Sequence, residues 1–536
     1  MSAPKRLAAL LPAFLAILAT LPSAAPAGLL RYYFPPEKTA PRVVEADVCV
    51  YGANSGGIAA AVAAARAGQA AVIVNPALHL GGLTSGGLGH TDTGDKRGIG
   101  GISREFYQRV GRHYGSGAMV MNFEPHVAEA VYKELVAAAK IPVFHREFLA
   151  SVEKSGARLV SLTTEGGLTV RAKMFIDASY EGDLMAKAGV SFHVGREGNG
   201  VYGETLNGAY VSKGHQFLYP VDPYVVAGDP KSGLLPGIED GQPVPGAGDH
   251  RVQAYNFRVC MTDTAANRVP FQKPAGYNRA DYELLARYLA AGWDDVFYKF
   301  DRVPNGKTDT NNHGAVSTDF IGANYGWPEG SYAEREKLFQ AHVTWQRGLF
   351  WFLANDPAVP AHIRAAMAVW GLAKDEFADT ENWPRQLYVR ESRRMVSDYV
   401  MTEHDCRWHR TAPDSVGLAS YGMDSHNCRR FVRDGRVLNE GNVQVGCAGA
   451  YPVSYRSIVP KKSECENLLV PVCLAASHIA YGSIRMEPVF MILGESSGIA
   501  ADLAIRGKLP LQDVPYAELR AALLKAGQVL DTPAKK

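Results

Sequence analysis

Short apolar runs and an alanine-rich segment alternate near the start of the chain. Residues 47–51 form an apolar run typical of a buried parallel strand, and residues 58–67 are rich in alanine and favour a helix. Gly68 ends this predicted helix, and residues 71–74 form a second apolar run. The order predicts a strand, a glycine turn, a helix and a second strand within one α/β unit.

Further along the chain the pattern predicts two more helices, a set of short strands and a change of texture. Residues 200–385 are rich in Tyr, Trp and Pro, which indicates an inserted mixed α+β domain in an α/β protein. The other predicted elements are helices from Ser103 to about residue 114 and over 125–139, short strands over 141–176, helical patches near 278–291, 332–354 and 360–370, a strand at 468–470 and a final helix at 488–506. The expected division is a signal at 1–27, a lead-in at 28–44, a cofactor domain at 45–199 and 386–515, the insert at 200–385 and a tail at 516–536.

The turn between the first strand and helix has the chemistry of a dinucleotide site. Gly52, Asn54, Ser55, Gly56 and Gly57 lie where a glycine fingerprint stands in a strand-turn-helix unit. Backbone N–H groups and the positive end of the helix would receive a pyrophosphate. Asn54 replaces the usual middle glycine and tolerates the left-handed dihedrals better than most residues. A glycine turn of an ordinary α/β protein is the plainer interpretation.

Two further segments extend this predicted site. Asn75 ends the second strand, where an acidic residue usually binds the ribose, and its amide is expected to bind the diol without charge. A glycine-rich loop follows at once, with Gly81, Gly82 and Thr84 as expected contacts.

Distant segments are expected to complete the site. They supply Asp177, Gly182 and Asp183 after a predicted strand, and Met486, Met491 and Gly494 around the start of the final helix. Several separated segments that converge on one long ligand favour FAD over NAD, and the N-terminus of the final helix would lie near the flavin ring.

Taken together, these motifs resemble a bacterial family of FAD-dependent oxidoreductases. The matching segments are Gly52-x-Asn54-x-x-Gly57, residues 79–89, 176–178 with 181–183, 305–313, 388–394, 476–482, and 485–491 with Gly494. The resemblance covers nearly all of the chain after the signal; some members of the family carry a xanthan lyase label. It implies a glutathione-reductase-like fold, with non-covalently bound FAD and oxidoreductase activity. The chain departs from the family at Asn75, where an acid is often found, and at Glu495, where Gln is common.

Composition and charge narrow the class of partner. The chain of 536 residues has 56 Lys and Arg against 54 Asp and Glu, and Lys5 and Arg6 carry the surplus. A neutral mature chain argues against nucleic acid, whose binding needs excess positive charge. An apolar stretch at 7–21 and the small residues at 25–27 follow Lys5 and Arg6, which predicts a cleaved secretory signal rather than a membrane anchor. No other stretch is predicted to span a membrane. The chain is therefore expected in the periplasm or outside the cell.

Seven cysteines remain, and no two are spaced as C-x-x-C. This spacing predicts neither a thiolate metal site nor a dithiol motif, and we expect no metal. Pairing among the cysteines cannot be assigned from the sequence.

The candidate catalytic residues are His478, His313 and Arg390. His478, expected between a core strand and the flavin segment, would accept a proton while FAD takes a hydride at N5. His313 would bind substrate hydroxyls, and Arg390 with Arg393 would clamp an anionic substrate. The plainer interpretations are a core histidine, a polar turn and a structural salt-bridge network. His90 lies near the expected flavin, where a covalent link is a further alternative.

The sequence therefore predicts an exported FAD-dependent oxidoreductase acting on a small polar substrate. Aromatic rings in the insert, among them Trp293, favour a carbohydrate-derived one, although packing in core helices explains most of these tryptophans. The alternatives are a flavin-dependent lyase or isomerase without net redox change, and a non-catalytic carbohydrate-binding protein. The electron acceptor stays open.

Overall fold

The computed structural model describes residues 30–36 and 40–532, so the predicted signal at 1–27 lies outside the described residues. The main sheet has the strand order β3-β2-β1-β6-β5-β4, with β20 beside β6. Its strands are β1 (Arg42–Tyr51), β2 (Ala71–Asn75), β3 (Val143–His145), β4 (Leu149–Ser155), β5 (Arg158–Thr164), β6 (Leu168–Asp177) and β20 (Leu468–Leu469). β1, β2, β3, β6 and β20 are parallel to one another, whereas β4 and β5 are antiparallel neighbours.

Both faces of β1 are covered, which explains its continuous apolar run. Val48 and Val50 belong to the core that contains α1 (Ser55–Arg66). Cys49 and Tyr51 point to the opposite core, which includes side chains of β5 and β6. Successive side chains of a strand face opposite sides, so the buried run reports two packed faces rather than one.

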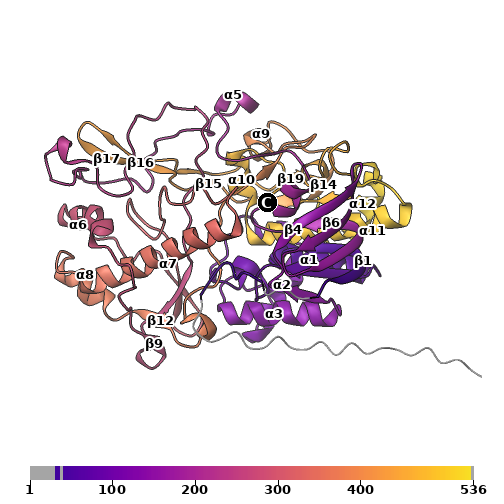
Figure 1. The fold of residues 1–536 in the computed structure, drawn as a ribbon, viewed down its shortest axis with the longest axis horizontal. Helices are drawn as coiled ribbons and strands as arrows, with labels where there is room; N and C mark the ends of the chain where they lie inside the picture. Colours follow the sequence, from indigo (N-terminus) through magenta and orange to yellow (C-terminus); the bar gives the residue numbers. More distant parts are fainter. Residues whose placement is uncertain (1–29, 37–39, 533–536) are drawn as a thin grey trace, which may run out of the picture.

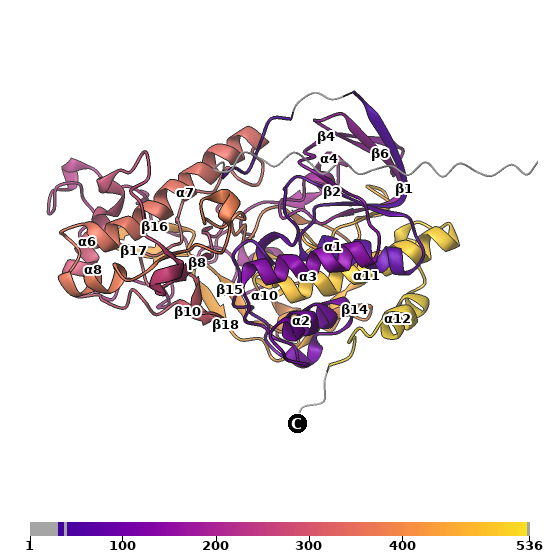
Figure 2. The same ribbon diagram turned by 90° about the horizontal axis from the view of Figure 1, so that it is seen from below.

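Helix α1 packs along α11 (Glu487–Gly507), and Figure 2 shows the two helices side by side. Glycines permit this close approach: a Cβ on Gly56 would lie 2.8 Å from the carbonyl oxygen of Phe490, and one on Gly494 would overlap the carbonyl oxygen of Gly56. Helices α2 (Gly101–His113) and α3 (Pro125–Ala138) pack beside this pair. Helix α11 therefore holds the start of α1 against the sheet.

Four local predictions need correction. β1 begins at Arg42 rather than at residue 47, because residues 42–46 also pair with β6, and 42–44 of these belong to the expected lead-in. Gly100 stands at the N-cap of α2, and the hydroxyl of Ser103 instead donates to the carbonyl of Pro488. The expected tail begins with a helix, α12 (Tyr516–Lys525), which buries Leu519 and Leu523.

The fourth correction concerns α11. By length and composition this helix could cross a membrane, whereas no stretch after the signal was predicted to do so. Most of its apolar window, 83%, is buried inside the protein, as expected for a core helix. Length and hydropathy alone do not separate the two cases.

Much of the predicted insert builds the end of the molecule that lies opposite β1 and α12 in Figure 1. A sheet with the order β10-β11-β8-β12-β9 lies there, beside the long helix α7 (Tyr332–Asn355). Its strands are β8 (Val259–Thr262), β9 (Arg268–Val269), β10 (Phe300–Val303), β11 (Lys307–Thr310) and β12 (Gly371–Ala373). Shorter helices are α4 (Asp183–Lys187), α5 (Asn199–Tyr202), α6 (Glu283–Ala290), α8 (Ala361–Met367), α9 (Glu403–Cys406) and α10 (His478–Ile484).

Two-stranded pairs complete the described structure. They are β7 (Phe192–His193) with β13 (Arg394–Met395), β14 (Ser415–Ala419) with β19 (Tyr451–Ser454), β15 (Met423–Ser425) with β18 (Val443–Val445), and β16 (Arg429–Arg433) with β17 (Arg436–Glu440). After residue 386 only β20 joins the main sheet, while Phe431 of β16 bridges Glu239 of the insert. The predicted boundary at residue 386 is not tested by this pairing and stays a prediction.

Candidate functional site

The glycine turn before α1 has the conformation that its residue types favour. Gly52 has φ +100°, and a Cβ there would lie 2.9 Å from the backbone of Ala178. Asn54 is the N-cap of α1 and accepts a 2.9 Å hydrogen bond from the N–H of Gly57, while its amide donates to the carbonyl of Ala178. Asn54 thus joins the turn to the end of β6 and caps the helix, which explains why Asn replaces glycine at this position.

A cavity with about 1280 Å³ of empty space opens beside this turn. Five predicted cofactor residues line it, namely Gly52, Asn54, Asn75, Gly82 and Asp183. Asn75 accepts a 3.2 Å hydrogen bond from the N–H of Ala53 and donates to the carbonyl of Ala77 at 2.8 Å. It therefore joins two segments of the chain that line the cavity.

The same cavity has walls that the sequence analysis missed. They come from three separate segments, and include Arg31, Tyr32, Phe34, Arg146, Asp379, Arg385 and Gln386. The guanidinium of Arg146 lies 4.7 Å from the ring centroid of Phe34, which brings residues of the lead-in to the cavity wall. No local motif marks these residues, because each belongs to an ordinary polar or aromatic stretch.

Two predicted cofactor contacts bind a buried carboxyl group instead of facing this cavity. Ser55 donates a 2.5 Å hydrogen bond to Glu487, and Thr84 donates at 2.7 Å. Tyr180 donates to the same carboxyl group at 2.9 Å. Burial raises the pKa of Glu487, and the three hydroxyl groups lower it in part. The start of α11 is thereby bound to α1 and to the glycine loop. Gly81 lies outside the cavity wall, and its N–H donates to the carbonyl of Ala53.

The segment after β6 forms a tight, polar turn. Asp177 accepts hydrogen bonds from the N–H and hydroxyl of Ser179, and burial raises the pKa of Asp177 to about 6. Gly182 takes φ +68° at the start of α4. Burial would raise the pKa of Asp183, but the guanidinium groups of Arg335 and Arg393 hold it below its ordinary value.

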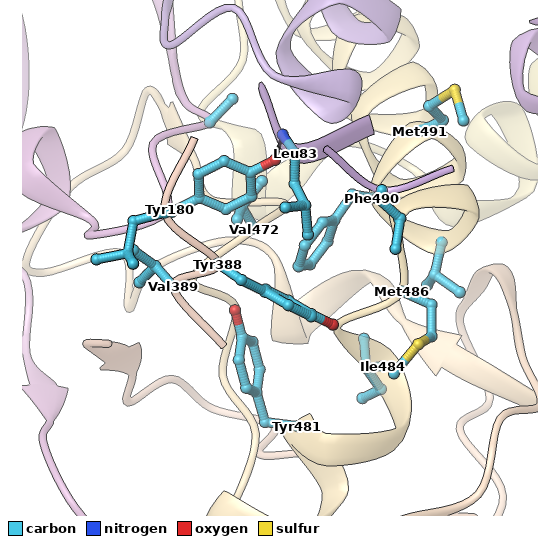
Figure 3. Close-up of a cluster of buried hydrophobic side chains, with 14 of the residues drawn as sticks. Leu83, Tyr180, Tyr388, Val389, Val472, Tyr481, Ile484, Met486, Phe490 and Met491 are labelled. Carbon is cyan, nitrogen blue, oxygen red and sulfur yellow. Dashed lines mark hydrogen bonds between the residues drawn. The ribbon is translucent and has the colours of Figure 1, made fainter. Parts of the chain in front are cut away.

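The start of α11 lies beside an apolar cluster. Figure 3 shows Tyr180, Tyr388 and Phe490 gathered around it, with Met486 at one side and Met491 apart from the group. Met491 contacts the hydroxyl of Tyr132 at 3.6 Å, and so it packs toward α3. Gly494 is a helix-packing position, as described above. Of Met486, Met491 and Gly494, Met486 therefore lies nearest to the buried ionic group described next.

Next to Met486 lies a buried ionic group that we call the Arg485 cluster: Asp319, Arg390, Asp424, His426 and Arg485. Arg390 pairs with Asp319 at 2.9 Å, and Arg485 pairs with Asp424 at 3.0 Å. His426 lies between them, with Nδ1 at 2.7 Å from Asp319 and Nε2 at 3.4 Å from Asp424. Within these five residues two arginines balance two carboxylates, so only the histidine could add net charge; the buried Arg430, which also interacts electrostatically with Asp319, lies outside this balance.

Both carboxylates of the Arg485 cluster stay ionised. Burial would raise the pKa of Asp319, but Arg390 and His426 hold it far below its ordinary value. Burial opposes ionisation of Asp424 as well, and His426 and Arg485 lower its pKa to about 2. The hydroxyl of Tyr388 accepts a 2.8 Å hydrogen bond from Arg485, which joins the cluster to the apolar group of Figure 3.

The predicted catalytic residues fall into different surroundings. His478 is 1% exposed, and its Nδ1 lies 2.7 Å from Glu391. Gln253 connects this pair to the Arg485 cluster, because its amide donates to Glu391 at 2.9 Å and its carbonyl accepts from Arg485 at 3.3 Å. Arg390 belongs to the cluster, whereas Arg393 pairs with Asp183. A carboxylate neutralises the charge of each arginine, so neither side chain is free to bind an anionic substrate.

His313 lines a second cavity, which has about 390 Å³ of empty space. Trp293, Asn311 and Thr318 line it as well, and Thr318 directly precedes Asp319 of the Arg485 cluster. His313 pairs with Asp295 at 2.7 Å. Of the tryptophans in the insert, Trp327 and Trp383 are fully buried, whereas Trp293 reaches this cavity. The backbone N–H of His90 donates to Asp309, and its side chain lines neither cavity.

Glu495, the second departure from the family pattern, is buried on α11. Its carboxyl group accepts hydrogen bonds from the N–H of Ile102 at 2.7 Å and from Gln528 at 2.6 Å. Burial raises the pKa of Glu495 to about 7. No lysine or arginine pairs with it among the ion pairs of the described residues.

Replacing Glu495 by Gln is expected to stabilise the protein at pH 8 by about 2 kcal/mol, with little change at pH 5. A raised folded-state pKa favours the protonated acid, so wild-type stability falls as the pH rises from the ordinary carboxyl range through 7. Gln keeps the acceptor for Ile102 without the charge. Thermal melting across this pH range tests the difference; equal pH slopes for both proteins would contradict it.

Comparison with known proteins places these features in context. Among solved structures, a flavin-containing monooxygenase from Stenotrophomonas maltophilia is 17% identical, with a TM-score of 0.20 and coverage of 29% of this chain and 42% of the other. A thioredoxin reductase from T. acidophilum is 21% identical, with a TM-score of 0.17 and coverage of 25% and 34%. The chain thus spans less than half the length of these two structures.

The remaining two comparisons differ in outcome. No curated protein matches the chain. The sequence profile of a protein family described as "FAD dependent oxidoreductase" matches residues 47–523, which include the glycine turn, the insert and α11. The match begins at β1 and ends within α12.

Proposed function

Because the chain belongs to the family of FAD-dependent oxidoreductases, we propose that it oxidises a small, uncharged polar molecule, which gives up a hydride to N5 of FAD. The family match and the sheet topology confirm what the sequence predicted about the family, the Rossmann-like fold and the cofactor. The substrate class, the proton acceptor and the place of action are the parts proposed here.

The cofactor residues fit this assignment. The turn at Gly52 and Gly56 leaves no room for side chains, because Cβ atoms there would meet the backbone of Ala178 and Phe490, and this packing fixes the turn at the edge of the cavity. Gly52, Asn54, Asn75 and Gly82 line the larger cavity and would hold the dinucleotide. Among them, Asn75 is the last residue of β2, the position from which the ribose was expected to be bound.

The observation that carries the substrate proposal is the charge balance of the Arg485 cluster. A site for an anionic substrate needs an uncompensated arginine or lysine, but Arg390 and Arg485 are each paired with a carboxylate. The smaller cavity beside the cluster adds Trp293, Asn311 and His313, which suits stacking and hydroxyl recognition. This combination favours a neutral sugar or another polyhydroxylated alcohol.

His426 is our candidate for the group that accepts the substrate proton. Asp319 lies 2.7 Å from Nδ1 and holds that nitrogen as the donor, so Nε2, which faces Asp424 at 3.4 Å, is the nitrogen proposed to accept the proton. Burial keeps bulk water from competing for that lone pair, since His426 is 7% exposed. Asp319 is thus proposed as a positioning residue. His478 stays a prediction as the alternative base.

Anaerobic reduction of the protein-bound flavin tests the proposal. A panel of neutral sugars, alcohols and uronic acids is added to the holoenzyme, and loss of the flavin absorbance is followed. We expect a neutral sugar or alcohol to reduce the flavin, and the matching uronic acid to react more slowly. Faster reduction by uronic acids would contradict the neutral-substrate class. Turnover with the flavin still oxidised would favour the lyase or isomerase alternative.

Export is proposed from residues 1–27, with Lys5 and Arg6 before an apolar stretch. Cell fractionation and N-terminal sequencing of the recovered protein test it. A protein retained inside the cell with residues 1–27 intact would overturn it.

A further inference from the structure

Two cysteines that are distant in the sequence meet in the structure. Cys406 is the last residue of α9, and Cys447 follows β18. The backbone N–H of Ala448 donates a 3.1 Å hydrogen bond to the carbonyl of Cys406, so the two chains run next to each other here. The two thiols are also close enough for each to shift the pKa of the other.

The two thiols differ in accessibility and acidity. Cys447 is partly exposed, and it is the only cysteine of the described residues that is not buried. The hydrogen bond from Cys406 lowers the pKa of the Cys447 thiol, and burial opposes this effect. Burial raises the pKa of the Cys406 thiol well above its ordinary value. Nucleophilic attack on an external disulfide requires an accessible thiolate, so Cys447 is suited to react first and Cys406 second.

The thiol of Cys447 also contacts two oxygen atoms of neighbouring residues. Its Sγ lies 3.0 Å from the carbonyl oxygen of Tyr421 and 3.4 Å from the hydroxyl of Ser483. Ser483 belongs to α10, two residues before Arg485 of the proposed reactive cluster. A change at Cys447 therefore alters a side-chain contact of α10, the helix that precedes α11.

We propose that Cys406 and Cys447 form a reversible disulfide. The Cys447 thiolate attacks one sulfur of a low-molecular-weight disulfide, which gives a mixed disulfide and releases one thiol. The Cys406 thiolate then attacks the Cys447 sulfur and releases the second thiol. Two electrons pass from the two cysteines to the external disulfide, and the two cysteine protons end on the released thiols.

The bond would close a loop that contains β14 to β18, with α9 at one end and the residues before β19 at the other. Closing such a loop restricts the unfolded chain, so oxidation is expected to raise the melting temperature by about 3 °C. Reduction should return it to the starting value. The proposal is independent of the substrate assigned above.

The test uses the purified full-length holoenzyme, first reduced and then treated with oxidised glutathione. After denaturation, thiol titration should find two fewer free cysteines, and peptide mass analysis should find Cys406 joined to Cys447. Seven free thiols after treatment would overturn the proposal, as would a bond that joins other cysteines.

Two variants resolve the order of the steps. Cys406→Ser should retain glutathione on Cys447, because the second thiol is missing, whereas Cys447→Ser should retain none. Cys465→Ser is the matched control, since Cys465 is buried and should leave the Cys406–Cys447 bond unchanged. Glutathione on Cys406 in the Cys447→Ser protein would overturn the assigned order.

Discussion

Replacing His426 by Asn is expected to slow substrate-dependent reduction of the bound flavin by about 100-fold or more, with FAD still bound. Asn keeps a polar group in the Arg485 cluster but has no basic nitrogen. The rate constant is measured by anaerobic stopped-flow mixing, and retained flavin absorbance shows that the cofactor site is intact. A wild-type rate in this variant would remove His426 from the mechanism.

The matched comparison is the same change at the other buried histidine. His478→Asn removes one partner of Glu391, which still pairs with Arg394, and leaves the Asp319–His426 pair in place. If His426 is the base, His426→Asn should abolish the dependence of the reduction rate on a histidine ionisation, and His478→Asn should keep it. The reverse result would assign the role to His478.

Asp319→Asn separates positioning from catalysis. The amide of Asn carries no negative charge, so it cannot form the charge-assisted hydrogen bond with Nδ1–H of His426. The change also leaves Arg390 without its carboxylate partner. We expect a slower reduction rate and a shifted pH profile, since the base is still present but is no longer held in one tautomer. An unchanged profile would show that Asp319 serves only the fold.

Replacing Gly494 by Ala is expected to lower the free energy of unfolding by about 3 kcal/mol and to weaken FAD binding together with it. The new Cβ would overlap the backbone carbonyl oxygen of Gly56, and a backbone atom cannot move as a flexible side chain does. Helices α1 and α11 must separate, which displaces the glycine turn at the start of α1. Thermal melting and titration of the apoprotein with FAD measure the two effects.

A glycine without close neighbours provides the control. Gly200 lies in the short helix α5, and a Cβ there would meet nothing within 4 Å. Gly200→Ala should therefore change stability by less than about 1 kcal/mol and leave FAD affinity unaltered. Equal stability and equal FAD affinity of the Gly494→Ala protein and the wild type would contradict the proposed helix contact.

Sequence reasoning found the parts of the site that depend on nearby residues. Gly52, Asn54 and Asn75 stand where the strand, turn and helix pattern predicted, and they line the larger cavity. It could not find Arg146 or Arg385, because these residues reach the cavity from separate segments. His426 was missed for the same reason: Asp319, its partner, lies 107 residues away in the chain.

Other predictions changed once their partners were known. Arg390 was expected to clamp an anion, but Asp319 neutralises it across 71 residues. Ser55 and Thr84 were expected to contact the cofactor, but their hydroxyls bind Glu487 on α11. In each case the residue type was informative about polarity, and the fold decided which group satisfies it.

The amino-acid pattern alone was sufficient for the α/β class, the glycine turn, the cofactor and the family. The class and the turn rest on short-range rules: apolar runs form buried strands, alanine favours helices, and glycine permits the turn. The family and its cofactor rest on the resemblance of motifs along the chain to a known family. The tertiary structure alone decided which charges cancel, which histidine lies beside a carboxylate and which two cysteines meet. Those properties depend on contacts between distant segments, and burial makes their charge and pKa depend on the partner rather than on the neighbouring sequence.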